Sequence, residues 1–94
     1  MAIFHLTIKN VEDRETAEKL ILESGVDSIE ISHLGCLLSD PEIKSAHEMA
    51  QRIGIFNNGA DGVQVPYLIS VLSQYNGFHS QAVWEWLDGQ ETGK

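Results

Sequence analysis

The order of the first three predicted elements most constrains the fold of this 94-residue chain. Residues 2–8 are β-formers throughout and predict a strand. Residues 12–24 open with acidic residues, carry one apolar face and end before Gly25, which predicts a helix. Residues 27–33 alternate and predict a second strand. A strand, a helix and a strand joined by short connections favour a right-handed crossover between two parallel strands.

The rest of the chain predicts two further helices and one ambiguous segment. Residues 33–38 are an apolar link, and residues 39–42 (Ser-Asp-Pro-Glu) are typical of a helix start. The helix predicted from this start ends at Gly54. Residues 65–75 fit either an edge strand that contains a proline or a buried helix, because periodicity alone does not separate the two. Residues 80–87 predict the last helix.

Charge is unevenly distributed along the chain. Fourteen acidic residues oppose six Lys and Arg, which gives a net charge of −8. Residues 1–52 hold ten acids and five bases, whereas residues 53–84 hold one acid, Asp61, and neither Lys nor Arg. Residues 53–84 therefore supply core or face a ligand or partner. The acidic balance argues against nucleic acid and against an anionic membrane surface as partners.

Length and composition predict one soluble domain over residues 1–94. Residues 54–62 have turn chemistry and predict a loop insertion, and residues 90–94 predict a tail. No apolar run is long enough to span a membrane and no signal peptide opens the chain, so we expect a cytoplasmic protein. The sequence leaves the oligomeric state open.

Several spaced motifs indicate a family. Residues 17–21 (Ala-Glu-Lys-Leu-Ile) precede Gly25-Val26-Asp27, and Val65-Pro66 follows later. Gly77 comes eleven residues after that proline, just before residues 80–83 (Ser-Gln-Ala-Val). Their order resembles the glutaredoxin branch of the thioredoxin-like fold and the N-terminal domain of glutathione transferases. The resemblance implies an α/β fold of order βαβ-α-ββ-α, with a small mixed sheet flanked by helices and a cis proline.

Departures from the family pattern bear on function. Val11 and Arg14 occupy the positions of the family's Cys-x-x-Cys, and the single cysteine, Cys36, lies elsewhere. Dithiol exchange needs a nucleophilic thiolate and a resolving partner, so that chemistry is not expected. No other catalytic constellation is evident, and an enzyme is not favoured. Cys36 is expected to be a buried, inert thiol, with glutathionylation or intermolecular pairing as the alternative.

The resemblance implies a redox-inactive binding or interaction module. Its ligand would be a glutathione-like peptide or a protein partner, held by the backbone beside the cis proline and by the start of the last helix. The alternative is that these positions only preserve the fold. No cofactor is implied beyond glutathione as a ligand, and the four histidines have no metal-ligand spacing. The predicted binding residues are Asn10, Val65, Pro66, Gly77, Phe78, His79 and Ser80.

Two other functions remain open at this point. Residues 68–89 fit the apolar and glycine spacing of a helix-turn-helix regulator, although the recognition helix would carry neither Lys nor Arg. The net charge of −8 also fits an acidic inhibitor, such as a phage-borne protein that blocks a basic site on a target.

Overall fold

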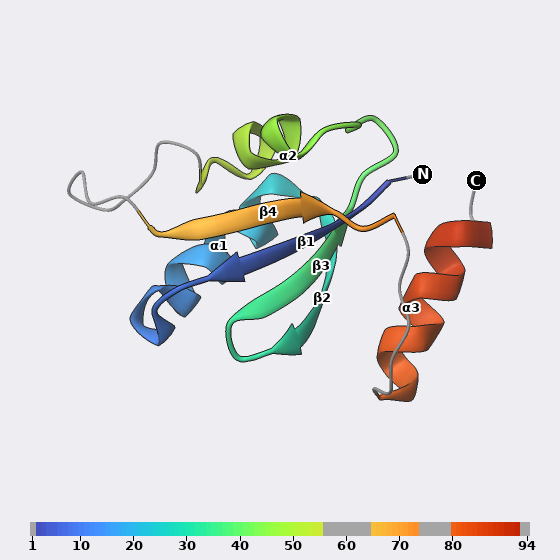
Figure 1. The fold of residues 1–94 in the computed structure, drawn as a ribbon, viewed down its shortest axis with the longest axis horizontal. Coiled ribbons are helices and arrows are strands. Elements are labelled where there is room, and N and C mark those ends of the chain that lie inside the picture. Colours follow the sequence, from blue (N-terminus) through green and yellow to red (C-terminus); the bar gives the residue numbers. More distant parts are fainter. Residues whose placement is uncertain (1, 56–64, 74–79, 93–94) are drawn as a thin grey trace.

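A computed structural model describes residues 2–55, 65–73 and 80–92, and shows a mixed α/β protein with a small sheet and three α-helices (Figure 1). In chain order the elements are β1 (Ile3–Ile8), the 3-10 helix η1 (Val11–Asp13), α1 (Arg14–Ser24), β2 (Asp27–Ser32), β3 (Gly35–Ser39), α2 (Ala46–Ile53), β4 (Tyr67–Val71) and α3 (Gln81–Thr92). None of the helices within the described ranges is long and apolar enough to cross a membrane.

The four strands lie in the order β2-β3-β1-β4, and every neighbouring pair is antiparallel. Leu6 of β1 lies opposite Cys36 of β3 on one side and opposite Ile69 of β4 on the other. The predicted parallel pair, and with it the mixed sheet, is wrong: β1 and β2 run the same way, but β3 lies between them. This is the split β-α-β arrangement of ferredoxin-like folds, with α3 added to it. A thioredoxin-like topology is not confirmed.

The sequence did not reveal β3, because the segment lacks the usual strand signals. Its pattern does not alternate, since β3 is an inner strand with side chains buried on both faces. The turn that precedes it, His33-Leu34, has none of the Asn-Gly or Asp-Gly chemistry that marks two-residue hairpins. The apolar link predicted for residues 33–38 is therefore mostly a strand.

The start of α2 differs from the prediction. Ser39 is the last residue of β3, where it pairs with Ile3 and is 2% exposed, so it cannot cap a helix. The cap is Ser45, whose Oγ accepts a hydrogen bond from the backbone N–H of Glu48 at 3.1 Å. The predicted stop is confirmed: Gly54 closes α2 in the left-handed region, with φ +83°.

The other local predictions have different outcomes. A helix ending at Gly25 is present, and its cap has φ +76°. The ambiguous segment contains a strand, β4, so the first helix of a helix-turn-helix is not formed there. The predicted tail at residues 90–94 is wrong in part, because α3 continues through Gly89 to Thr92. Most of the predicted loop at 54–62 lies outside the described residues.

Side chains pack in two layers on opposite faces of the sheet. Alternate residues of β1 point to opposite faces, so Phe4 and Leu6 belong to one layer and Ile3 to the other. The first core lies under α1 and α2 and contains Phe4, Leu6, Ile8, Ala17, Ile21, Val26, Leu38, Ile43, Met49, Ala50, Ile53, Ile55, Val65 and Ile69. The second core lies under α3; its buried members are Ile3, Leu37, Val83 and Leu87, and Ile29, Ile31, Leu72, Trp84 and Trp86 pack against it while partly exposed.

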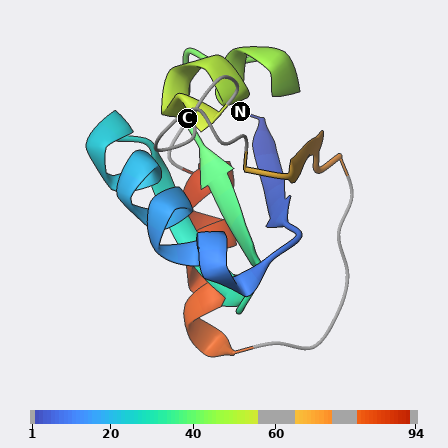
Figure 2. The ribbon, with the colours of Figure 1, turned by 90° about the vertical axis from the view of Figure 1, so that its left-hand side faces the viewer.

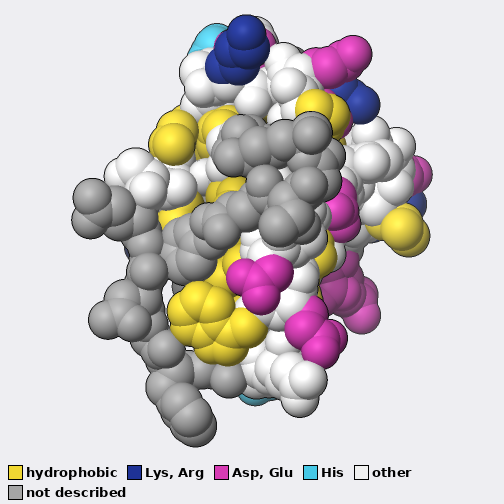
Figure 3. Space-filling view, turned by 90° about the vertical axis from the view of Figure 1, so that its right-hand side faces the viewer, with side chains coloured by type: hydrophobic (Ala, Val, Ile, Leu, Met, Phe, Trp, Pro, Cys, Tyr) yellow, Lys and Arg dark blue, Asp and Glu magenta, His cyan; other side chains and the backbone are white. Residues whose placement is uncertain are grey.

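Helix α3 is set apart from α1 and α2, at the far end of the sheet (Figures 1 and 2). Asp27 at the start of β2 fixes it there by accepting two hydrogen bonds: from Trp86 Nε1 at 3.1 Å and from Gln90 Nε2 at 2.7 Å. On this end of the molecule apolar side chains are bordered by acidic ones (Figure 3).

Candidate functional site

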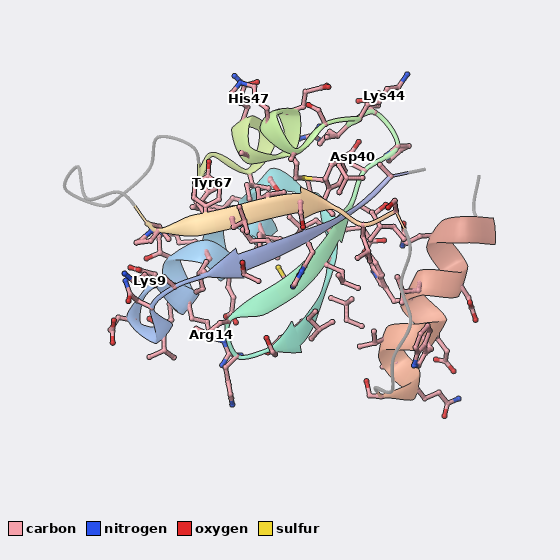
Figure 4. The ribbon with its side chains drawn as sticks, in the orientation of Figure 1. Lys9, Arg14, Asp40, Lys44, His47 and Tyr67 are labelled. Atoms are coloured by element: carbon pink, nitrogen blue, oxygen red, sulfur yellow. The ribbon has the colours of Figure 1, made fainter. Side chains whose placement is uncertain are left out.

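The residues that the sequence singled out for binding do not form one described site. Asn10 and Pro66 lie at the same end of the sheet, where the backbone N–H of Lys9 donates to the carbonyl oxygen of Pro66 at 3.1 Å. Lys9 and Tyr67 mark this end in Figure 4. The side-chain amide of Asn10 donates to Asp13 Oδ2 at 3.4 Å. The side chain of Asn10 therefore makes a hydrogen bond within its own turn.

The remaining predicted residues fall elsewhere. Val65 is buried in the first core, and the Val65–Pro66 bond is trans, whereas the resemblance implied a cis bond. Ser80 precedes α3, whose side chains pack on Ile3 and Leu72 at the opposite end of the sheet. Residues 77–79, which include Gly77, Phe78 and His79, lie outside the described residues.

A pocket of about 560 Å³ lies between α1 and the β2–β3 hairpin. We call it the α1–β2 pocket. Its volume falls in the range of small-molecule sites, which are mostly apolar with a few polar groups. The residues that line it are Leu6, Ile8, Arg14, Ala17, Glu18, Ile21, Leu22, Gly25, Val26, Ser28, Glu30, Ser32, His33, Leu34, Gly35 and Cys36.

The alternation of β2 explains why the pocket is open. Ser28 and Glu30 pair with Leu38 and Cys36, so they share the face that α1 covers. Ile29 pairs with Leu37 and faces the second core instead. The edge strand thus presents small or charged side chains to α1, and these do not fill the space beneath the helix.

Helix α1 contributes a small side chain and an exposed apolar one. Ala17 and Ile21 are its buried residues. The small Ala17 contributes little volume to the layer between helix and sheet. Leu22, which also lines the pocket, is 82% exposed. An apolar surface therefore runs from the buried floor of the pocket to its outer edge.

Arg14 bridges α1 and the hairpin at the polar end of the pocket (Figure 4). Its Nη2 donates to both carboxylate oxygens of Glu30, at 2.7 and 2.6 Å, and its Nε donates to Glu18 Oε1 at 2.8 Å. Its Nη1 lies 3.2 Å from His33 Nδ1. A guanidinium can only donate hydrogen bonds, so Nδ1 is the acceptor in this contact. Hydrogen bonding to Glu18, followed by the charge of Glu30, raises the pKa of Arg14.

This ion-pair network is exposed to solvent. The Arg14 side chain is 34% exposed, and those of Glu18 and Glu30 are 58% and 46% exposed. Exposed ion pairs of this kind contribute little to stability. The network can therefore rearrange at small cost when another charged group enters the pocket.

Cys36 lies in the wall of the pocket and is half-buried. Burial, and then the negative charges of Glu30 and Glu18, raise the pKa of its thiol to about 11. The group is therefore a neutral thiol at pH 7 and a poor nucleophile. The chemistry that this wall offers is apolar contact and not covalent catalysis.

The described residues contain no group of three or more His, Cys, Asp and Glu placed to hold a metal ion. Comparison of the chain with protein-family models, curated proteins and solved structures finds no match. The site must therefore be interpreted from its own geometry.

Sequence reasoning missed the α1–β2 pocket, although one signal for it was present. In β2 both isoleucines share one face of the strand, and Ser28 and Glu30 share the other. That signal locates a pocket only once the position of β3 is known, because β3 decides which face of β2 lies under α1.

Proposed function

We propose that this chain is a binding module and that its site is the α1–β2 pocket. The observation that carries the proposal is an apolar cavity of about 560 Å³ with one charged group of residues at its rim. Such a combination is typical of sites that take a small molecule, whose apolar body is buried and whose polar end is oriented by a few side chains.

Three features of the pocket support binding. Its floor is built from regular secondary structure, because Leu6 and Ile8 belong to the inner strand β1 and Ile21 to α1. Its rim is held by hydrogen bonds that cost little to rearrange, since Arg14 and its partners are exposed. The apolar surface of Leu22 is exposed, and an apolar ligand would remove it from water.

The test is a titration with a neutral amphiphile, 1-octanol, followed by the backbone amide signals of the ¹⁵N-labelled protein. We expect saturable shifts at residues that line the pocket, such as Ala17, Ile21 and Cys36, with a dissociation constant on the order of 1 mM for so small a ligand. Shifts confined to other regions, or none at concentrations up to the solubility limit, would contradict the proposal.

A pair of matched variants controls this experiment. Ser28 and Ser70 are both exposed strand serines, but only Ser28 lines the pocket. Ser28→Leu fills the space beneath α1 and should weaken octanol binding at least tenfold, whereas Ser70→Leu on β4 should leave it unchanged. Equal effects of the two substitutions would show that octanol binds elsewhere.

The resemblance to glutaredoxins offers a second kind of module, for which Asn10, Val65 and Pro66 would contact a glutathione-like peptide or a protein partner. This stays a prediction from the sequence, as does an acidic inhibitor of a basic target. A glutathione titration in the same assay separates the glutaredoxin-like prediction from the pocket proposal, because its shifts would lie at Asn10 and Tyr67 and not at Ala17 and Cys36.

A further inference from the structure

We propose that the α1–β2 pocket selects a cationic amphiphile, a small molecule with an apolar body and a protonated amine. This rests on the proposed function and names the class of ligand. Three features of the lining favour such a ligand: its balance of charge, the contacts of Arg14, and the position of its apolar surface relative to Glu30.

The charges that line the pocket are unequal. Arg14 supplies one positive charge, and Glu18 and Glu30 supply two negative charges. His33 is counted as neutral here, as the histidines are in the net charge of the chain. The lining therefore has a net charge of −1, and the whole chain has −8, which favours the approach of a cation.

Arg14, the one Lys or Arg of the lining, already contacts three side chains. Arg14 uses Nε on Glu18, Nη2 on both oxygens of Glu30 and Nη1 on His33. A ligand carboxylate that contacts Arg14 would lie beside Glu18 and Glu30, two carboxylates of its own sign. An ammonium group instead replaces part of Arg14 on Glu30, while the released guanidinium remains in water.

The surroundings of Cys36 also indicate a negative electrostatic potential inside the pocket. Besides burial, the charges of Glu30 and Glu18 raise the pKa of its thiol, which means that they disfavour an anion at that wall. A cation is favoured by the same field.

The apolar and polar parts of the lining are arranged to hold the two ends of such a molecule. Ile8, Ala17 and Ile21 supply the apolar floor. Glu30 faces the same side of the sheet from β2, where it pairs with Cys36. We expect the alkyl chain of such a ligand to lie along this floor and its amine to contact Glu30.

The experiment compares three probes of equal chain length, n-octylammonium, 1-octanol and octanoate, at pH 7 and low ionic strength. The readout is the shift of pocket amides in the labelled full chain. We expect octylammonium to bind about tenfold more tightly than octanoate, with octanol between them, since each exposed charge contact changes affinity by a few-fold. The difference should shrink in high salt.

Glu30→Gln removes one negative charge of the lining and should reduce the preference for octylammonium to less than about twofold. Glu42→Gln removes the same charge from an exposed position that does not line the pocket, and should leave the preference intact. Glu18→Gln provides a second variant at the rim, with an expected effect similar to that of Glu30→Gln.

The outcomes separate the two proposals. If octanol binds in the pocket but octanoate binds as tightly as octylammonium, the charge selectivity is wrong and the binding site stands. If neither octanol nor octylammonium shifts the pocket amides, both proposals fail. If only a lysine-containing peptide shifts them and octylammonium does not, the occupant is a protein side chain and the small-molecule assignment is overturned.

Discussion

The two cores of this protein differ in size and in how they are closed. The first core packs fourteen buried side chains among the described residues between the sheet and two helices, α1 and α2. The second core has four buried side chains, and one C-terminal helix, α3, covers it. Strand β2 connects the two cores, because its isoleucines face the second and its Ser28 and Glu30 face the first.

This difference explains where the pocket forms. A β-strand has two faces. When the apolar face of an edge strand packs against one helix, its polar face lies against the helix on the other side of the sheet. In β2 the apolar face goes to α3. The larger core is therefore incomplete along β2, and that gap is the α1–β2 pocket.

The largest expected effect is on stability, from truncation of a buried side chain in the first core. Phe4 is fully buried there, and Phe4→Ala should lower the free energy of unfolding by about 3–5 kcal/mol, through lost burial and the cavity left behind. Urea unfolding followed by circular dichroism measures it. A change below 1 kcal/mol would show that the first core does not dominate stability.

Truncation of a buried side chain in the second core should lower stability less, and its effect should be confined more closely to α3. Leu87 is buried at 4% exposure, and Leu87→Ala should cost about 2–3 kcal/mol. Hydrogen exchange should speed up in α3 and much less in β1, because α3 packs on the small core alone. Equal acceleration in β1 and α3 would mean that the two cores unfold as one unit.

Alkaline pH should lower the stability of the protein, because the thiol of Cys36 in the pocket wall loses its proton. The folded pKa of Cys36 is about 11 against an ordinary value of 9.0, so the unfolded chain loses this proton first. Stability from the thiol is complete below pH 9 and is lost as the pH rises through about 11, by at most about 3 kcal/mol. Unfolding of the wild type should therefore be more sensitive to pH over this range than unfolding of Cys36→Ala. Parallel curves would contradict the raised pKa.

The smallest effect concerns the attachment of α3. Asp27→Ala removes the acceptor for both Trp86 and Gln90 and should destabilise the protein by about 1 kcal/mol, since these hydrogen bonds are exposed. Tryptophan fluorescence should shift to longer wavelength as Trp86 becomes more hydrated. Glu42→Ala, which removes an exposed acid elsewhere, should change neither property.

Local signals predicted β1, α1 and β2 well, because strand alternation, an acidic first turn and the left-handed Gly25 act within a few residues. They failed where two signals competed. Ser39 and Ser45 both precede a glutamate by three residues, and pairing of Ser39 with Ile3 decided between them. Such a choice depends on a strand thirty-six residues away in the chain.

The candidate site was harder to predict than the fold for the same reason. Cys36 was expected to be an inert thiol, and its raised pKa agrees with low reactivity, but its place in a pocket wall depends on its pairing with Glu30 and Leu6. Arg14 stood out in the sequence only as a residue in place of a cysteine. Its contacts with Glu30 and His33 arise from the tertiary fold.

The central claim is that the α1–β2 pocket holds an amphiphile with its apolar end on the floor and its cation at the rim. Intermolecular nuclear Overhauser effects between n-octylammonium and the labelled protein test this most directly. We expect contacts from the terminal methyl group of the probe to Ala17 and Ile21, and from the methylene next to nitrogen to Glu30. Contacts from the same probe to Leu68 and Val71, the exposed apolar residues of β4, without contacts to Ala17 or Ile21, would contradict it.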